Sequence, residues 1–127
     1  MENKMKRSGL RITPQRLEIA RILENLKNTH PSFTDICNAV NKKYPNMSRS
    51  TVHNNLKALE KLGLIASFSH IGETRYEMNL YLHINVVEKD GSIQDINDEE
   101  IRRHLEEILK IIRKKGKQVK NLTVIAD

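Results

Sequence analysis

The chain has 127 residues, with 22 Lys and Arg against 16 Asp and Glu. Hydrophobic residues make up 38% of it, enough for one folded domain with a small appendage and too much for a disordered chain. No apolar run approaches the roughly 18 residues of a membrane span, and no signal peptide is recognisable. The single cysteine, Cys37, excludes an internal disulfide and a cysteine-cluster zinc site. We therefore expect a cytoplasmic protein without a membrane partner.

The charge is unevenly distributed along the chain. Residues 1–76 contain 13 Lys and Arg and 6 Asp and Glu, a net charge of +7, whereas residues 77–127 contain 9 and 10, a net charge of −1. Lysine-rich surfaces are common, so the charge alone does not decide the function. A basic first part joined to a near-neutral remainder nevertheless indicates that the first part contacts nucleic acid.

Two amphipathic helices are predicted in the first forty residues. Thr13 can cap the first one, and Pro14 fits its first position because the N–H that proline lacks is unused there. Ser32 and Asp35 have the spacing of a capping box for the second. Apolar residues then recur at helical spacing, as Ile19, Ile22, Leu23 and Leu26 in the first helix and as Phe33, Ile36, Cys37 and Val40 in the second. Cys37 is thus expected to be an inert core thiol.

A third helix, residues 48–62, has two contrasting faces. Ser48 begins it, and Gly63 is suited to the left-handed conformation that ends a helix. The inner face is expected to consist of Val52, Leu56, Leu59 and Leu62. The opposite face, Arg49, Ser50, His53, Asn54 and Lys57, carries no acidic residue. Two helices joined by a tight turn, the second with such a face, indicate a helix-turn-helix with residues 48–62 as the recognition helix.

A hairpin follows the recognition helix. A strand is predicted up to Phe68, a turn over residues 69–73, and a return strand from Thr74. This arrangement is typical of a winged helix. Arg75 or His70 could contact phosphate there, or the hairpin could simply keep the surface soluble.

The pattern changes after residue 82. Strands are predicted at His83–Val87 and Ile93–Ile96, then a helix capped by Asn97 and ended by Gly116, then a strand at Val119–Ile125. Only 45 residues make up this β-β-α-β unit, so we expect it to bury its apolar face against a second copy. The predicted fold class is α+β: an amino-terminal winged helix-turn-helix (residues 1–82) followed by a small β-β-α-β dimerisation domain (residues 83–127).

Two stretches resemble the motifs of the ferric uptake regulator family. They are Leu-Arg-Ile-Thr-Pro-Gln-Arg at residues 10–16 and Pro-Asn-Met-Ser-Arg-Ser-Thr-Val-His-Asn-Asn-Leu at residues 45–56. Leu-Gly-Leu-Ile at residues 62–65 and the β-β-α-β order also resemble the family. The resemblance implies a homodimeric, metal-responsive transcription regulator, a repressor that binds palindromic operator DNA.

The resemblance also implies a regulatory metal site with His30, Glu77, His83 and Asp95 as ligands. Imidazole and carboxylate ligands suit Fe²⁺, Mn²⁺ or Zn²⁺. Tyr81 stands where the family usually has a further histidine. The chain also lacks the family's cysteine pair after His83, so no structural cysteine zinc is expected. Because six residues of extended strand span about 20 Å, Glu77 and His83 can share an ion only if residues 78–82 bend.

The leading hypothesis is a sequence-specific, dimeric DNA-binding regulator whose DNA contacts lie in the first part of the chain. The residues expected to read bases are Ser50, Thr51, His53 and Asn54. Those expected to anchor phosphates are Arg11, Gln15, Arg16, Ser48, Arg49, Asn55 and Lys57, with Lys6 and Arg7 as an extension. Asn55 could instead face inwards and cap the preceding turn. His53 replaces the tyrosine that is common in the family, so a different operator preference is expected.

Two rival functions stay open at this stage. One is a metal-independent regulator of the same fold, in which the ligand set has decayed. The other is a winged-helix protein-interaction module, whose exposed face would be apolar or acidic rather than basic and amide-rich. No enzyme is expected, because no nucleophile–base–acid set and no phosphate-binding glycine loop is present.

Overall fold

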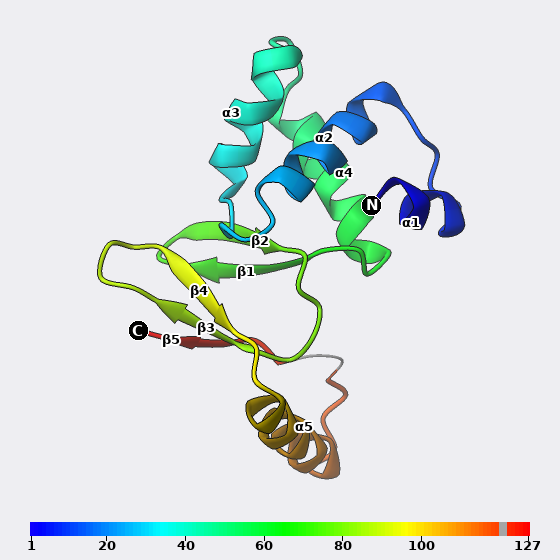
Figure 1. Cartoon of the computed structure of the whole chain (residues 1–127). Helices are drawn as coiled ribbons and strands as arrows, with labels where there is room; N and C mark the ends of the chain where they lie inside the picture. Colours follow the sequence, from blue (N-terminus) through cyan, green and yellow to red (C-terminus); the bar gives the residue numbers. More distant parts are fainter. Residues whose placement is uncertain (120–121) are drawn as a thin grey trace. The chain divides into compact units, whose positions relative to one another are not determined.

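The computed structural model describes residues 1–119 and 122–127 and divides into two compact units, Met1–Leu80 and Tyr81–Asp127 (Figure 1). The first unit contains α1 (Glu2–Arg7), α2 (Pro14–Asn25), α3 (Phe33–Lys43), α4 (Arg49–Lys61), β1 (Ala66–His70) and β2 (Glu73–Glu77). The second contains β3 (Ile84–Val87), β4 (Ile93–Ile96), α5 (Glu99–Lys114) and β5 (Val124–Ala126). The predicted α+β class and its order of elements are confirmed. Among the described residues, no helix is both long enough and apolar enough to cross a membrane.

Side-chain caps begin the three main helices of the first unit. The Thr13 hydroxyl accepts the Arg16 backbone N–H at 3.2 Å at the start of α2. At α3, Ser32 and Asp35 exchange two 3.0 Å hydrogen bonds, which is the predicted capping box. The Ser48 hydroxyl accepts the Thr51 N–H at 3.1 Å and begins α4. All three predicted caps are confirmed, since each satisfies a backbone donor that the helix leaves open.

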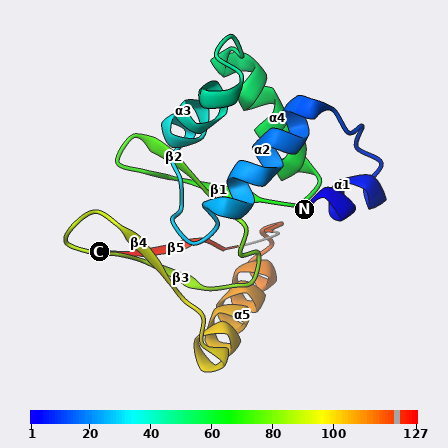
Figure 2. The same cartoon turned by 45° about the horizontal axis from the view of Figure 1, so that its top comes forward.

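The core of the first unit lies between α2, α3 and α4 (Figure 2). Ile19, Ile36 and Val52, one from each helix, are fully buried. Cys37 is buried as predicted. Leu62, predicted on the inner face of the recognition helix, is 38% exposed instead. Leu62 is the C-cap residue of α4 and still has helical dihedral angles, so at 100° per residue it falls at the edge of the Val52, Leu56 and Leu59 stripe, at the open end of the helix.

The short helix α1 was not predicted. From sequence, Lys6 and Arg7 are expected only as an amino-terminal extension. The structure places them in a six-residue helix whose Met5 is fully buried in the core of the first unit. Six residues are too few to establish a helical period, so the sequence carried no signal for this element.

The predicted hairpin is present with a shorter turn. β1 and β2 pair antiparallel from Ala66↔Glu77 to His70↔Glu73, leaving only Ile71 and Gly72 as the turn, instead of residues 69–73. Their φ angles are +50° and +74°. Two left-handed residues match the twist of a tight hairpin, which lets the strands pair up to the turn itself.

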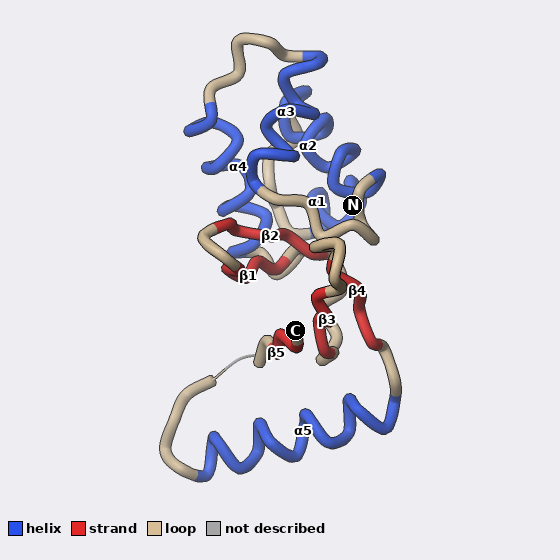
Figure 3. Tube along the Cα trace, turned by 90° about the vertical axis from the view of Figure 1, so that its left-hand side faces the viewer, coloured by secondary structure: helices blue, strands red, loops and turns tan. Residues whose placement is uncertain are grey.

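The second unit is a three-stranded sheet with α5 on one side (Figure 3). The strand order is β4-β3-β5, with β4 antiparallel and β5 parallel to β3, so the β-β-α-β prediction is confirmed. The cap of α5 is Asp98, not Asn97; its carboxylate accepts the N–H groups of Glu100 and Ile101. β5 is shorter than the predicted strand at residues 119–125, of which residues 120–121 lie outside the described part.

Candidate nucleic-acid interface and metal ligands

The predicted DNA-contacting residues lie mainly on the surface of the first unit. Arg16 and Asn55 are half-buried, and the other nine are exposed: Arg11, Gln15, Ser48, Arg49, Ser50, Thr51, His53, Asn54 and Lys57. The first turn of α4 contains no acidic residue. A phosphate backbone would therefore meet cations, hydroxyls and amides on this face.

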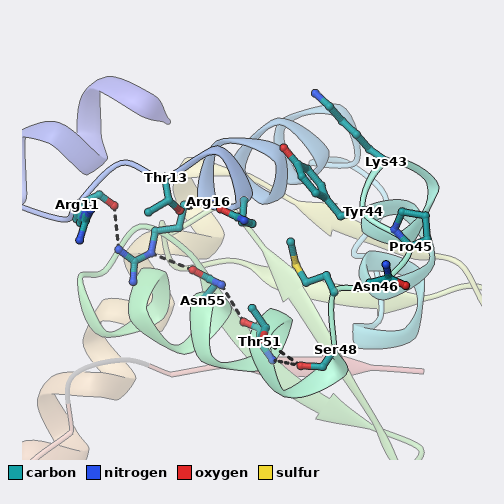
Figure 4. Close-up of a pocket in the computed structure, with 12 residues that line it drawn as sticks. Arg11, Thr13, Arg16, Lys43, Tyr44, Pro45, Asn46, Ser48, Thr51 and Asn55 are labelled. Atoms are coloured by element: carbon teal, nitrogen blue, oxygen red, sulfur yellow. Dashed lines mark hydrogen bonds between the residues drawn. The ribbon is translucent and has the colours of Figure 1, made fainter.

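A hollow lies between the start of α2, the loop after α3 and the start of α4 (Figure 4). Six predicted phosphate or base contacts line it: Arg11, Gln15, Arg16, Ser48, Thr51 and Asn55. Lys43 also lines it and was not among the predicted contacts. Lys43 lies at the end of α3 and reaches Glu18 at 3.5 Å. The hollow thus combines three cationic side chains with polar groups, a combination that suits an anion.

Arg16 and Asn55 connect α2 to α4. The Arg16 Nε donates to Asn55 Oδ1 at 2.9 Å, and its Nη1 donates to the Arg11 carbonyl at 2.8 Å. The Asn55 amide nitrogen donates to the Thr51 carbonyl at 2.8 Å, one turn back in α4 (Figure 4). Asn55 therefore uses both ends of its amide inside the protein. These contacts favour the alternative in which Asn55 faces inwards and bonds to the preceding turn.

The Phe33 ring contacts the side chains of two residues of the predicted interface. The Arg49 guanidinium carbon lies 4.9 Å from the centre of the Phe33 ring, within the range of a cation–π contact. The His53 ring meets the same ring edge-on, with centroids 5.9 Å apart. From sequence, Phe33 is expected only in the apolar stripe of α3. Its contacts with Arg49 and His53 depend on how α3 packs against α4, which cannot be predicted from a local sequence pattern.

Arg75 in the wing donates hydrogen bonds to other residues of the first unit. Its Nη1 donates to the His30 carbonyl at 3.2 Å and its Nη2 to the Glu73 carboxylate at 3.2 Å. The Tyr76 N–H donates to the Pro31 carbonyl at 3.0 Å, which joins β2 to the loop before α3. These contacts favour a structural role for Arg75 over the phosphate contact considered from sequence.

In the first unit, two predicted metal ligands lie together. His30 is 2% exposed and Glu77 6%, and His30 Nε2 lies 3.7 Å from the Glu77 carboxylate. His30 has a φ of +51°, which is uncommon outside glycine. A buried imidazole beside a buried carboxylate is a donor pair that fits a divalent cation, because the cation would compensate the desolvated charge.

The second unit contains the other two predicted ligands. His83 Nε2 lies 3.6 Å from Asp95 Oδ1, while His83 Nδ1 lies 2.6 Å from the Tyr81 carbonyl oxygen. A carbonyl cannot donate, so Nδ1 carries the proton and the lone pair of a neutral ring is on Nε2. The Tyr81 ring, in place of the family's histidine, contacts the Arg102 guanidinium at 5.3 Å. The four predicted ligands thus form two histidine–carboxylate pairs, one in each unit.

Cys37 is separate from these groups. It is 2% exposed, and burial raises the pKa of its thiol above the ordinary value. As the only cysteine of the sequence, it cannot form the cysteine pair of a structural zinc site within the chain.

A winged helix with an acid-free recognition face, followed by a β-β-α-β unit, defines a DNA-binding regulator of transcription. The comparisons with known proteins identify which kind. A profile of the ferric uptake regulator family matches residues 7–125. A ferric uptake regulation protein homolog of Archaeoglobus fulgidus is 38% identical over 123 residues, covering 97% of this chain and 91% of that protein. The chain belongs to the ferric uptake regulator family.

Other relatives agree with this assignment. The peroxide-responsive repressor PerR of Staphylococcus epidermidis is 33% identical over 95 residues, which cover 73% of this chain and 63% of PerR. The structure is similar to a zinc-bound manganese uptake regulator, with a TM-score of 0.69, 30% identity and coverage of 98% and 96% of the two chains. A zinc uptake regulator complexed with zinc and DNA shares the fold, with a TM-score of 0.75 at 18% identity and coverage of 98% and 84%. The predicted family and function as a metal-responsive transcription regulator are confirmed.

Proposed function

We propose that this chain is a homodimeric repressor that binds palindromic operator DNA through α4 and responds to a divalent metal ion. The observation that supports it most directly is the exposed, acid-free first turn of α4 beside the basic hollow. Ser50, Thr51, His53 and Asn54 lie on the exposed surface of α4, where a helix placed in the major groove reads base edges. A cytoplasmic location would give this repressor access to its operator DNA.

The residues predicted to anchor phosphates fall into two groups. Arg11, Gln15, Arg49, Lys57 and Ser48 are exposed and can reach the backbone directly. Arg16 and Asn55 act mainly by holding α2 against α4, with the remaining guanidinium N–H groups of Arg16 left for phosphate. Phosphate contacts provide affinity and register, whereas the few base contacts provide specificity.

The metal ion takes ligands from both units: His30 and Glu77 from the first, His83 and Asp95 from the second. Two carboxylates balance the charge of a divalent ion, and mixed nitrogen and oxygen ligands suit Fe²⁺, Mn²⁺ or Zn²⁺. An ion that needs ligands from both units favours the arrangement in which all of them reach it. This is a shift in the population of arrangements, and those that fit the operator become more frequent.

Homodimerisation is assigned to α5. Only Leu105 and Leu109 of this sixteen-residue helix are buried, whereas Ile108 is 45% and Ile111 53% exposed. A second copy would cover these isoleucines and present two recognition helices to two half-sites.

The test is a DNA-binding titration with a palindromic family-type operator, in chelator and with Fe²⁺, Mn²⁺ or Zn²⁺ added separately. Binding that needs one of the metals supports the proposal. Equally tight binding in chelator would instead support the metal-independent regulator, which the Tyr81 departure keeps open as the second candidate. Absence of operator binding under every condition would refute both and favour a protein-interaction module.

A further inference from the structure

Among its described residues, the second unit contains one buried polar side chain that the family-derived ligand set does not use. Asn85 lies in β3 between Ile84 and Val86 and is fully buried. Its amide nitrogen has no hydrogen-bond partner among the described residues. Burying a partly unsatisfied amide where an aliphatic residue would fit lowers stability. The residue is therefore a candidate for a functional role.

Strand geometry places Asn85 with two of the predicted ligands. His83 directly precedes β3, two residues before Asn85, and its ring lies against the Asn85 amide. Asn85 is also directly opposite Asp95 in the register of β3 and β4, and residues directly opposite one another share a face. The Asn85 amide oxygen accordingly lies 3.2 Å from His83 Nε2, which in turn lies 3.6 Å from Asp95 Oδ1.

These three atoms are all electron-pair donors. The Tyr81 carbonyl requires the ring proton of His83 on Nδ1, so Nε2 of the neutral ring offers a lone pair towards Asn85 and Asp95. An imidazole nitrogen, an amide oxygen and a carboxylate oxygen that face each other are stabilised by a cation between them. The hydrogen bond from Nδ1 to a backbone carbonyl is also the outer contact that metal-binding histidines usually make.

We propose that Asn85 is a metal ligand, which provides an amide oxygen beside His83 and Asp95 and replaces the ligand lost at Tyr81. This inference rests on the proposed metal-dependent function and adds a residue to it. An amide oxygen in place of an imidazole makes the donor set richer in oxygen. Oxygen-rich sets favour Mn²⁺ over Zn²⁺, so Asn85 also affects which ion is preferred.

The experiment measures the binding of metal alone to the full-length protein, by calorimetry with Mn²⁺ and by the visible absorption of bound Co²⁺. Asn85→Leu removes the oxygen at similar volume, and Asn85→Asp keeps an oxygen. We expect Asn85→Leu to weaken Mn²⁺ binding by about tenfold or more and to change the Co²⁺ spectrum. Asn85→Asp should retain both. Gln94→Leu, the same kind of change at an exposed position of β4 opposite Val86, is the matched control and should change neither.

The outcomes separate the two proposals. If the parent protein binds Mn²⁺ or Co²⁺ and Asn85→Leu binds as tightly with the same spectrum, the Asn85 assignment is wrong and the metal-dependent function stands. If the parent binds neither ion, both are wrong. Urea unfolding without metal should show Asn85→Leu at least as stable as the parent, so that weaker metal binding is not a folding defect. If Asn85→Leu unfolds more easily than the parent and also binds no metal, the Asn85→Asp variant distinguishes the two explanations. Metal binding by Asn85→Asp would support the ligand role, and loss of metal binding in Asn85→Asp would refute it.

Discussion

Arg49 tests the proposed DNA interface most directly. It is exposed at the first position of α4, with its guanidinium stacked on Phe33. In a homodimer, Arg49→Ala removes two cations from the interface. Each phosphate contact contributes about 0.9 to the slope of log K against log salt. The substitution should therefore reduce that slope by about 1.8.

This change in slope is large enough to measure. Between 50 and 200 mM salt, a slope difference of about 1.8 means that the parent loses about tenfold more affinity than Arg49→Ala does. The assay is a fluorescence-anisotropy titration with operator DNA at four or more salt concentrations, with the metal held constant. Arg49→Lys should keep most of the slope, because it keeps the charge.

Arg103 provides the matched control. It is an exposed arginine of α5 in the second unit, and Arg103→Ala makes the same change in net charge. Its slope should equal that of the parent. The assignment of Arg49 to phosphate would be refuted by an unchanged slope in Arg49→Ala, or by an equal fall in Arg103→Ala, which would show only the effect of net charge.

The remaining predictions concern stability, reactivity and the metal. Leu105→Ala should lower the free energy of unfolding by about 2–5 kcal/mol in urea titrations, because the side chain is 4% exposed; a loss under 1 kcal/mol would contradict its core position. Cys37 should react with a thiol reagent much faster in urea than in the native protein, since burial raises its pKa; equal rates would show that it is accessible. The hydrogen bond from Arg21 lowers the pKa of Glu18, so the stability that Glu18 contributes is present above the ordinary pKa of about 4.3 and is lost as the pH falls through the lowered value. Glu18→Gln should therefore flatten the pH dependence of urea unfolding in that window, and an unchanged curve would contradict the assignment. His83→Ala should abolish metal-dependent operator binding while leaving the circular dichroism spectrum unchanged, and a retained metal response would show that His83 is no ligand.

Much of the first unit could be predicted because its signals are local. A cap such as Thr13, Ser32 or Ser48 acts on a backbone group three residues away, so the sequence contains both partners. A local signal does not identify the capping residue where two neighbouring residues are equally able to cap the helix. Asn97 and Asp98 can both cap a helix, and the choice depends on where β4 ends and α5 begins.

The ligand environment depends on long-range pairing and could be predicted only in part. His30, Glu77, His83 and Asp95 were proposed from family motifs, and the structure pairs them within each unit. Asn85 was not predicted as a ligand, because its position beside the other ligands depends on the strand register that places it opposite Asp95. A polar residue inside an otherwise apolar strand was the available signal.

The loop before α3 connects the proposed metal ligands of the first unit to its proposed DNA-contacting surface within four residues. His30 lies beside Glu77, and its carbonyl accepts from Arg75 of the wing. Two residues later Ser32 caps α3, and Phe33, its first residue, contacts both Arg49 and His53 on α4. A change in the backbone of His30, held at a φ of +51°, must be absorbed by the wing or by the start of α3. Since Phe33 lies at that start and contacts Arg49 and His53, the proposed ligand His30 is joined to the recognition helix by a short run of covalent and packing contacts within the first unit.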